Sequence, residues 1–244
     1  MSDVQKQTDP GLDALLARAL AALDAKDIDQ AITVITSGGE PLEAGAAFAS
    51  LGKVLYRDRK DVTSMIAIGE AGITFCLQEA KSAVDAATAA KLKTRARNIA
   101  YNTAANCWPG WDDDGIRIDK DHLLSGLRLA GICRDLVSEL QPGHEAVGTA
   151  YWLIGALKLA AGRPREALPD FEHARRDFEL GGAAAQELMA RGYFALARKA
   201  DPISAAAGTR EFTAALQELR KEGSKDSLFF TEQLVVADRI LLVC

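Results

Sequence analysis

A row of polar side chains near the middle of the chain is the feature best suited to binding a ligand. The residues recur at intervals of three and four: Arg95, Asn98, Asn102 and Asn106. This spacing places them along one face of a helix. Asparagine is a poor helix former, so its repeated use costs stability unless the amides have partners. Each amide offers two donors and an acceptor, which suit peptide backbones, carboxylates and sugar hydroxyls. The row is therefore either a ligand-facing ladder or a set of hydrogen bonds to neighbouring helices and to the loop that follows.

Two tryptophans follow directly in a chain that is otherwise poor in aromatic residues. Trp108 and Trp111 lie in a Trp-Pro-Gly-Trp segment, and aromatic residues make up only 6% of the sequence. Indole rings combine a broad apolar surface with one hydrogen-bond donor, so they serve in recognition sites. They can equally anchor a loop on the body of the protein, and both interpretations remain open. If the loop folds back into the groove, Arg95, His122, Tyr151 and Trp152 would lie near the two tryptophans.

An acidic run after the tryptophans raises the question of a calcium-binding loop. Asp112–Asp114 precede Gly115, and an EF-hand loop needs a glycine at its sixth position. With that alignment the first position is Gly110, the eighth is an arginine and the twelfth is Asp121 instead of glutamate. We therefore predict no metal site, and expect a solvated acidic turn in which Asp119 or Asp121 caps the next helix.

The histidines offer little for catalysis. His122, His144 and His173 are scattered along the chain, and the pattern indicates no carboxylate partner at helical spacing. His122 adjoins the loop and is the one acid–base candidate, whereas we expect His144 to help begin a helix and His173 to face solvent. The sequence carries no phosphate-binding loop, dinucleotide-binding glycine motif or nucleophile elbow. We therefore predict no catalytic residue and no cofactor.

The elements that position these residues are predicted to be helices throughout. Alanine, the best helix former, dominates, while prolines mark the expected helix starts and glycines the expected ends. The pattern predicts about eleven helices, at 11–24, 27–37, 41–57, 61–82, 85–107, 120–140, 144–161, 164–180, 183–199, 203–222 and 226–243, with a non-helical insert at 108–119. Pro142 and Pro202 are each expected in a first helical turn, and Pro169 predicts a kink or a late helix start.

An internal repeat accompanies the helices. Residues 148–181 place Ile154-Gly155 three residues after Tyr151, and Ala167 and Phe171 follow a turn glycine. This segment resembles a tetratricopeptide (TPR) repeat, whose period is about 34 residues. The match is divergent, because Lys158 stands where the family usually has tyrosine. Weaker matches occur at 24–35, 48–71 and 188–195.

The resemblance implies an all-α fold, a right-handed α-solenoid of about five TPR-like hairpins over residues 10–225. Residues 1–9 would form a flexible tail and residues 226–244 a C-terminal capping helix. Stacked hairpins share an apolar core, and we expect small residues to let the paired helices touch: Ala31, Gly52, Gly155 and Ala167. Two alternatives for the C-terminal helix are a homodimer contact and a segment that fills the groove.

Composition excludes several classes of protein. The chain has 244 residues, of which 48% are apolar and 26% charged, which is a globular balance rather than a disordered one. A net charge of −5 argues against a nucleic-acid partner. The apolar runs are too short to span a bilayer, and the N-terminus does not resemble a secretory signal. The four cysteines, which include Cys244, form no CxxC pair, so we expect reduced thiols and a cytoplasmic location.

Two functions remain open on these grounds. The resemblance implies an interaction module whose concave groove, lined by the polar row, binds a peptide segment or C-terminus of a partner protein. The alternative is a small-molecule-binding protein or enzyme with a pocket made of Asn98, Asn102 and Asn106, the Trp108–Trp111 insert and His122. The direction in which the tryptophans point would discriminate between them.

Overall fold

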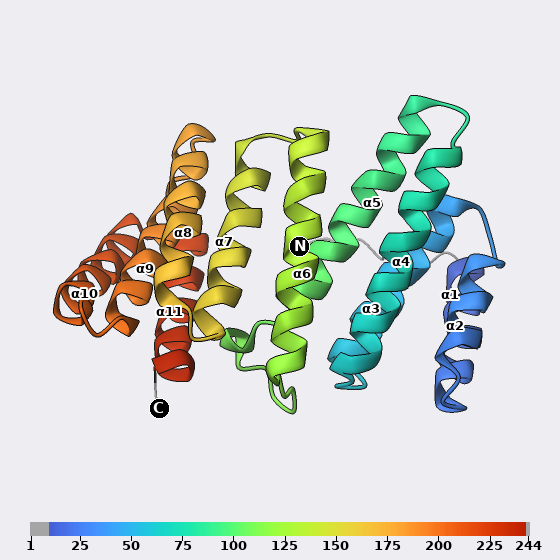
Figure 1. Cartoon of the computed structure of the whole chain (residues 1–244), viewed down its shortest axis with the longest axis horizontal. Helices are drawn as coiled ribbons and strands as arrows, with labels where there is room; N and C mark the ends of the chain where they lie inside the picture. The colour runs from blue at the N-terminus through green and yellow to red at the C-terminus, as the bar shows by residue number, and fades with distance from the viewer. Residues whose placement is uncertain (1–9, 243–244) are drawn as a thin grey trace, which may run out of the picture. The chain divides into compact units, whose positions relative to one another are not determined.

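The computed structural model of the chain describes residues 10–242, and these residues contain eleven α-helices, one 3-10 helix and no strand (Figure 1). The helices are α1 (Pro10–Asp24), α2 (Ile28–Thr36), α3 (Pro41–Arg57), α4 (Val62–Ser82), α5 (Ala86–Ala105), η1 (Pro109–Trp111), α6 (Lys120–Leu140), α7 (His144–Ala160), α8 (Pro164–Leu180), α9 (Ala184–Ala200), α10 (Ala205–Glu222) and α11 (Lys225–Leu242). The all-α prediction is confirmed. The expected tail at 1–9 and Cys244 lie outside the described residues.

Most helix boundaries follow from local capping chemistry. The backbone N–H groups of Gln30 and Ser64 donate to the side chains of Asp27 and Asp61, at 2.8 and 2.9 Å, and so satisfy donors that the helix cannot pair itself. Prolines begin α3 and α8, where the missing N–H has no cost.

Two predictions about local structure are wrong, and a third is narrowed. Pro142 and Pro202 precede α7 and α10 instead of lying in their first turns. Helix α8 begins at Pro164 and runs through Pro169, so it has no late start, and the kink at Pro169 stays a prediction. The insert at 108–119 is not wholly irregular, because η1 forms one 3-10 turn at Pro109–Trp111.

The chain divides into two compact units, and the boundary between Ala100 and Tyr101 falls inside α5. In the first unit α1 packs against α2, and α3 packs against α4. In the second unit α7 packs against α8, α9 packs against both α8 and α10, and α11 packs against α9, α10 and η1 (Figure 1). Each unit is thus built from helices that pack against their neighbours in sequence. A single solenoid over residues 10–225 stays a prediction.

The α7–α8 pair, which carries the best repeat match, shows how small residues bring helices together. A Cβ added at Gly155 would lie 2.8 Å from the ring of Phe171, and one added at Gly148 would lie 2.8 Å from the ring of Phe178. Both glycines therefore face phenylalanines at a distance that no larger residue allows. Ala167 is fully buried in the same pair. The expectation for Gly52 is wrong, because a Cβ there would meet nothing within 4 Å.

Cys76, Cys107 and Cys133 are buried and free of disulfides. Burial raises the pKa of the Cys76 thiol to about 11, so it stays protonated and unreactive at neutral pH. Within residues 10–242, no helix combines the length and the apolar character needed to cross a membrane.

Candidate functional site

The polar row on α5 is only partly available to a ligand. Asn102 is exposed, whereas Asn98 and Asn106 are half-buried. The Asn98 side-chain oxygen accepts hydrogen bonds from the guanidinium of the neighbouring Arg97, at 2.7 and 3.2 Å. The stem of Arg95 packs against α3, where its Cγ lies 2.8 Å from the position of a Cβ added at Gly45. Local contacts therefore use part of the row, and a ligand at Asn102 stays a prediction.

The two loop tryptophans point into the second unit. The Trp108 side chain is buried, with 1% of its surface exposed, and its ring lies 4.9 Å from Trp111, 5.8 Å from Trp152 and 5.9 Å from Tyr193 in edge-on contacts. Tyr193 stacks in turn on Phe171, at 5.6 Å. We call these five rings the aromatic cluster. Because α7, α8, α9 and η1 each contribute a ring, the cluster joins the loop to three helices.

Further contacts fasten the same loop. The Trp111 indole N–H donates to the carbonyl oxygen of Ala105 at 2.7 Å. Helix α11 packs against η1, and Arg239 forms an ion pair with Asp112 at 2.5 Å. The arrangement favours the interpretation of the tryptophans as anchors over their interpretation as a binding wall. It also gives Asp112 a partner other than a metal.

The aromatic cluster includes buried polar atoms that are not hydrogen-bonded to any described residue. These are the indole N–H groups of Trp108 and Trp152 and the hydroxyl of Tyr193, none of which has a hydrogen-bond partner within residues 10–242. Burial raises the pKa of the Tyr193 hydroxyl, so it stays protonated. Each such group costs about 1–3 kcal/mol of desolvation, which the packing of the rings must offset.

The histidines all have structural partners. His122 completes a capping box at the start of α6. The backbone N–H of His122 donates to the Asp119 carboxylate at 2.9 Å, and the backbone N–H of Asp119 donates to the ring Nδ1 of His122 at 3.3 Å. Of the two residues expected to cap this helix, Asp119 is the one that does so. The ring of His122 therefore orients the start of this helix.

The expectation that no histidine has a carboxylate at helical spacing is wrong. His173 Nε2 lies 3.3 Å from Asp177, four residues later on α8, and His144 Nδ1 lies 2.8 Å from the same carboxylate. Tyr151 stacks on His173, with ring centroids 3.8 Å apart, and does not join the aromatic cluster. The spacing of His173 and Asp177 was the signal for this contact. No group of three metal-ligating side chains is present in residues 10–242.

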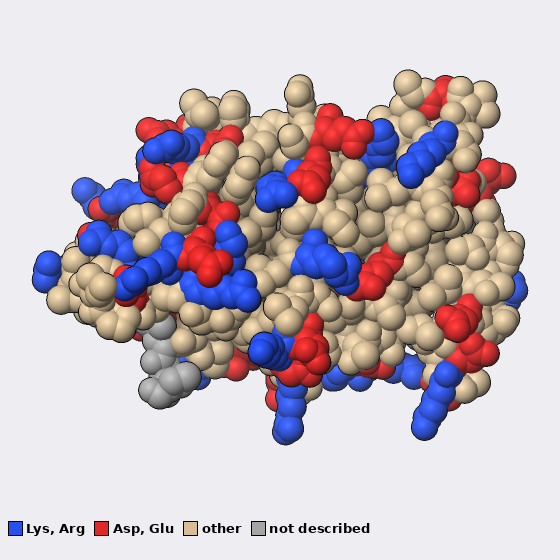
Figure 2. All heavy atoms as spheres, viewed as in Figure 1, with Lys and Arg blue, Asp and Glu red and all other residues tan. Residues whose placement is uncertain are grey.

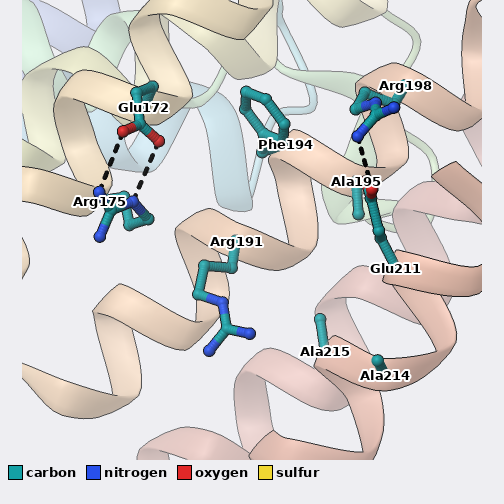
Figure 3. A pocket seen from close by; sticks show the side chains of 9 residues that line it. All are labelled: Glu172, Arg175, Arg191, Phe194, Ala195, Arg198, Glu211, Ala214 and Ala215. Atoms are coloured by element: carbon teal, nitrogen blue, oxygen red, sulfur yellow. Dashed lines mark hydrogen bonds and ion pairs between the residues drawn. The ribbon is translucent and has the colours of Figure 1, made fainter. Parts of the chain in front are cut away.

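Sequence reasoning missed a groove on the second unit. Basic and acidic side chains intermingle over the region of α8 and α9 (Figure 2). There a hollow of about 280 Å³ opens between α8, α9 and α10 (Figure 3), and we call it the α9 groove. Its lining residues are Glu172, Arg175, Arg191, Phe194, Ala195, Arg198, Glu211, Ala214 and Ala215. Alanines and one aromatic ring form the apolar part of the lining, and charged residues form the rest.

Ion pairs hold the arginines of the groove. Arg175 makes two hydrogen bonds of 3.0 Å with Glu172, and these lower the pKa of the Glu172 carboxyl. Arg198 pairs with Glu211, and Arg191 with Glu218 at 2.6 Å. In Figure 3 the guanidinium groups of Arg175, Arg191 and Arg198 border the hollow, and Arg191 lies between the other two pairs.

The groove carried a faint signal in the sequence. Arg191, Phe194 and Arg198 recur at spacings of three and four, which puts them on one face of α9. Many solvent-facing helices share such a pattern, so the groove emerges only once α8 and α10 are placed beside α9. Its volume lies just below the range of roughly 300–1,000 Å³ that small-molecule pockets occupy. The groove is thus sized for one or two side chains.

No protein-family model matches the sequence, and a search of curated proteins finds no match either. The α9 groove and the aromatic cluster are therefore the features of the molecule from which a function can be inferred.

Proposed function

We propose that the protein is an interaction module built from helical hairpins, and that its second unit binds a segment of a partner protein in the α9 groove. The observation that carries the proposal is the composition of the groove. An aromatic ring and small apolar residues line it together with three arginines that have glutamate partners. Arginine and aromatic residues are enriched at protein interfaces, with apolar contacts central and polar contacts at the rim.

The arginines of the groove can exchange their glutamate partners for a carboxylate of a partner protein. The side chains of Arg191 and Glu218 are 40% and 45% exposed. Pairs exposed to this degree contribute only about 0–1 kcal/mol each, because water and salt screen them. A carboxylate on a partner can therefore replace a glutamate at small cost. We infer a partner segment that places an apolar side chain against Phe194 and a carboxylate beside it.

The TPR-like solenoid, its concave surface and a cytoplasmic location belong to the same proposal. The Gly155–Phe171 contact in the α7–α8 pair supports the hairpin repeat, and α11 packs against α9 and α10 in the manner of a cap. The buried thiols of Cys76, Cys107 and Cys133, which form no disulfide with one another, support a reducing compartment. The exposed amide of Asn102 is a second place where this module could contact the segment.

The alternative function, a small-molecule pocket or enzyme site at the loop, has less support. It requires the tryptophans to line a cavity, but Trp108 is packed among rings of three helices. It also requires a free acid or base, but the His122 ring is part of a capping box.

The proposal is tested by selecting peptides from a displayed library on the wild-type protein. We expect Phe194→Ala to weaken the selected peptides about tenfold or more, as truncation of a central aromatic side chain does. Asn102→Ala reports whether the α5 row takes part. Ile203→Ala is the matched control, because this apolar side chain is 83% exposed and lies outside the groove. Peptides that bind wild type and Phe194→Ala equally, with circular dichroism showing both folded, would show that the groove is not the site.

A further inference from the structure

Helix α11 has an apolar face that no other described element covers. Leu228, Phe229 and Val235 are 49%, 53% and 47% exposed. The opposite face of the helix is packed, since Leu234 and Ala237 are fully buried. Exposed apolar side chains grouped on one helix mark an interaction site more often than isolated ones do.

The sequence of this face is symmetric about Glu232. Leu228 and Phe229 precede it by four and three residues, and Val235 and Val236 follow it by three and four. In an antiparallel pair of identical helices, a two-fold axis at Glu232 places each residue opposite the one equally far on the other side. Phe229 then meets Val235 of the second copy, and Leu228 meets its Val236. In this one register, apolar residues of one copy therefore lie opposite apolar residues of the other copy.

The charges at this face fit the same arrangement. An open hollow of about 550 Å³ is lined by Arg220, Leu228, Thr231, Glu232, Val235 and Val236. Arg220 and Glu232 are both exposed, and neither forms an ion pair within residues 10–242. A two-fold axis brings the two Glu232 carboxylates together, and the Arg220 of each copy lines the same hollow as its Glu232. Two arginines then balance two glutamates.

The ends of the face do not oppose this pairing. Lys225 and Arg239 lie seven residues on either side of Glu232 and would face each other. The ion pair between Arg239 and Asp112 already offsets one of these charges.

We propose that this α11 face, with Arg220 from α10, is the contact of a two-fold symmetric dimer of the chain. A helix of an unrelated partner would need only the apolar stripe. The symmetry about Glu232 and the equal numbers of opposite charges are what a second copy of the same face requires. This surface is distinct from the α9 groove, so the dimer and the proposed binding of a partner segment stand or fall separately.

Sedimentation of the full chain between about 1 and 200 μM tests the proposal, because this range covers micromolar dissociation constants. We expect wild type to dimerise. Arg220→Glu and Glu232→Arg should each raise the dissociation constant at least tenfold, because each places four like charges at the axis. The exchange variant Arg220→Glu/Glu232→Arg should dimerise again. A mixture of the two single variants should form a heterodimer, since one copy then carries only acids and the other only bases there.

Ile203→Asp is the matched control, a charge placed on an exposed apolar residue that is not part of the α11 face, and it should leave the dimer unchanged. Circular dichroism checks that every variant is folded. A wild-type chain that stays monomeric overturns the proposal and leaves the face to a helix of another protein or to the ends of this chain. A dimer that both charge reversals leave intact overturns it as well, because the contact then lies elsewhere.

Discussion

Gly110 offers a sharp test of the tight packing around the loop tryptophan. A Cβ added at this position would lie 2.2, 2.5 and 2.6 Å from three atoms of the Trp108 indole. Carbon atoms in contact normally stay about 3.5–4.0 Å apart, so the ring would have to move by more than 1 Å. Trp111, Trp152 and Tyr193 surround that ring and leave it little room. We predict that Gly110→Ala lowers the free energy of unfolding.

The expected magnitude follows from the kind of clash. Gly110 does not have a positive φ, so alanine brings no backbone strain and the cost is steric. Overpacking of a tight core costs about 1–3 kcal/mol, and a rigid, enclosed indole places Gly110→Ala near 2–3 kcal/mol. Trp108→Ala should cost about 3–5 kcal/mol because it leaves a cavity. In the Trp108→Ala protein, Gly110→Ala should leave the free energy of unfolding almost unchanged, because the indole atoms with which the added Cβ clashes are absent.

A double-mutant cycle of these two substitutions measures the effect. Urea unfolding followed by far-ultraviolet circular dichroism gives the free energies of the four proteins. We expect a coupling of about 2–3 kcal/mol in the direction that relieves the clash. Additive costs would contradict the packing described for the loop, and so would a Gly110→Ala protein as stable as wild type.

Four further substitutions give opposed or conditional outcomes. Gly208→Ala should lower the free energy of unfolding by about 1–3 kcal/mol, because the added Cβ would lie 2.2 Å from the backbone of α9. Gly131→Ala should raise it by about 0.5–1 kcal/mol, because a Cβ there meets nothing within 4 Å; urea unfolding measures both changes. Tyr193→Phe should raise the free energy of unfolding by about 1 kcal/mol, because it removes a buried hydroxyl that has no partner in the described part of the chain; a loss of stability would reveal a partner for that hydroxyl. The hydrogen bonds from Arg165 lower the pKa of Asp201, so its contribution to stability is present above the ordinary carboxyl pKa of about 3.9 and is lost as the pH falls through the lowered value. The melting temperature of Asp201→Asn should therefore fall less than that of wild type between about pH 5 and pH 2, and equal slopes would contradict the pairing.

Helix boundaries could be predicted because their causes are local. Asp27, Asp61 and Asp119 cap the helices that follow them, and Pro41 and Pro164 begin helices, all within a few residues of sequence. The Gly155–Phe171 contact was predictable for a similar reason, since a short turn joins the two helices that carry it.

The roles of the candidate site residues could not be predicted in the same way. The sequence shows two tryptophans in a loop but gives no direction for their rings, and Tyr193, which fixes Trp108, comes from a helix distant in the chain. The α9 groove depends on the placement of α8 and α10 on either side of Arg191 and Phe194. Such contacts follow from tertiary packing, which no spacing on a single helix encodes. The His173–Asp177 pair, by contrast, was visible as a four-residue spacing.

Nuclear magnetic resonance of methyl groups tests the central claim most directly. Ala195, Ala214 and Ala215 line the α9 groove, and their methyl resonances report on it without any substitution. When a peptide selected on the wild-type protein is added, we predict shifts concentrated on these three alanines. If the resonances of these three alanines stay unchanged and resonances on other helices shift instead, the assignment of the groove as the binding site is contradicted.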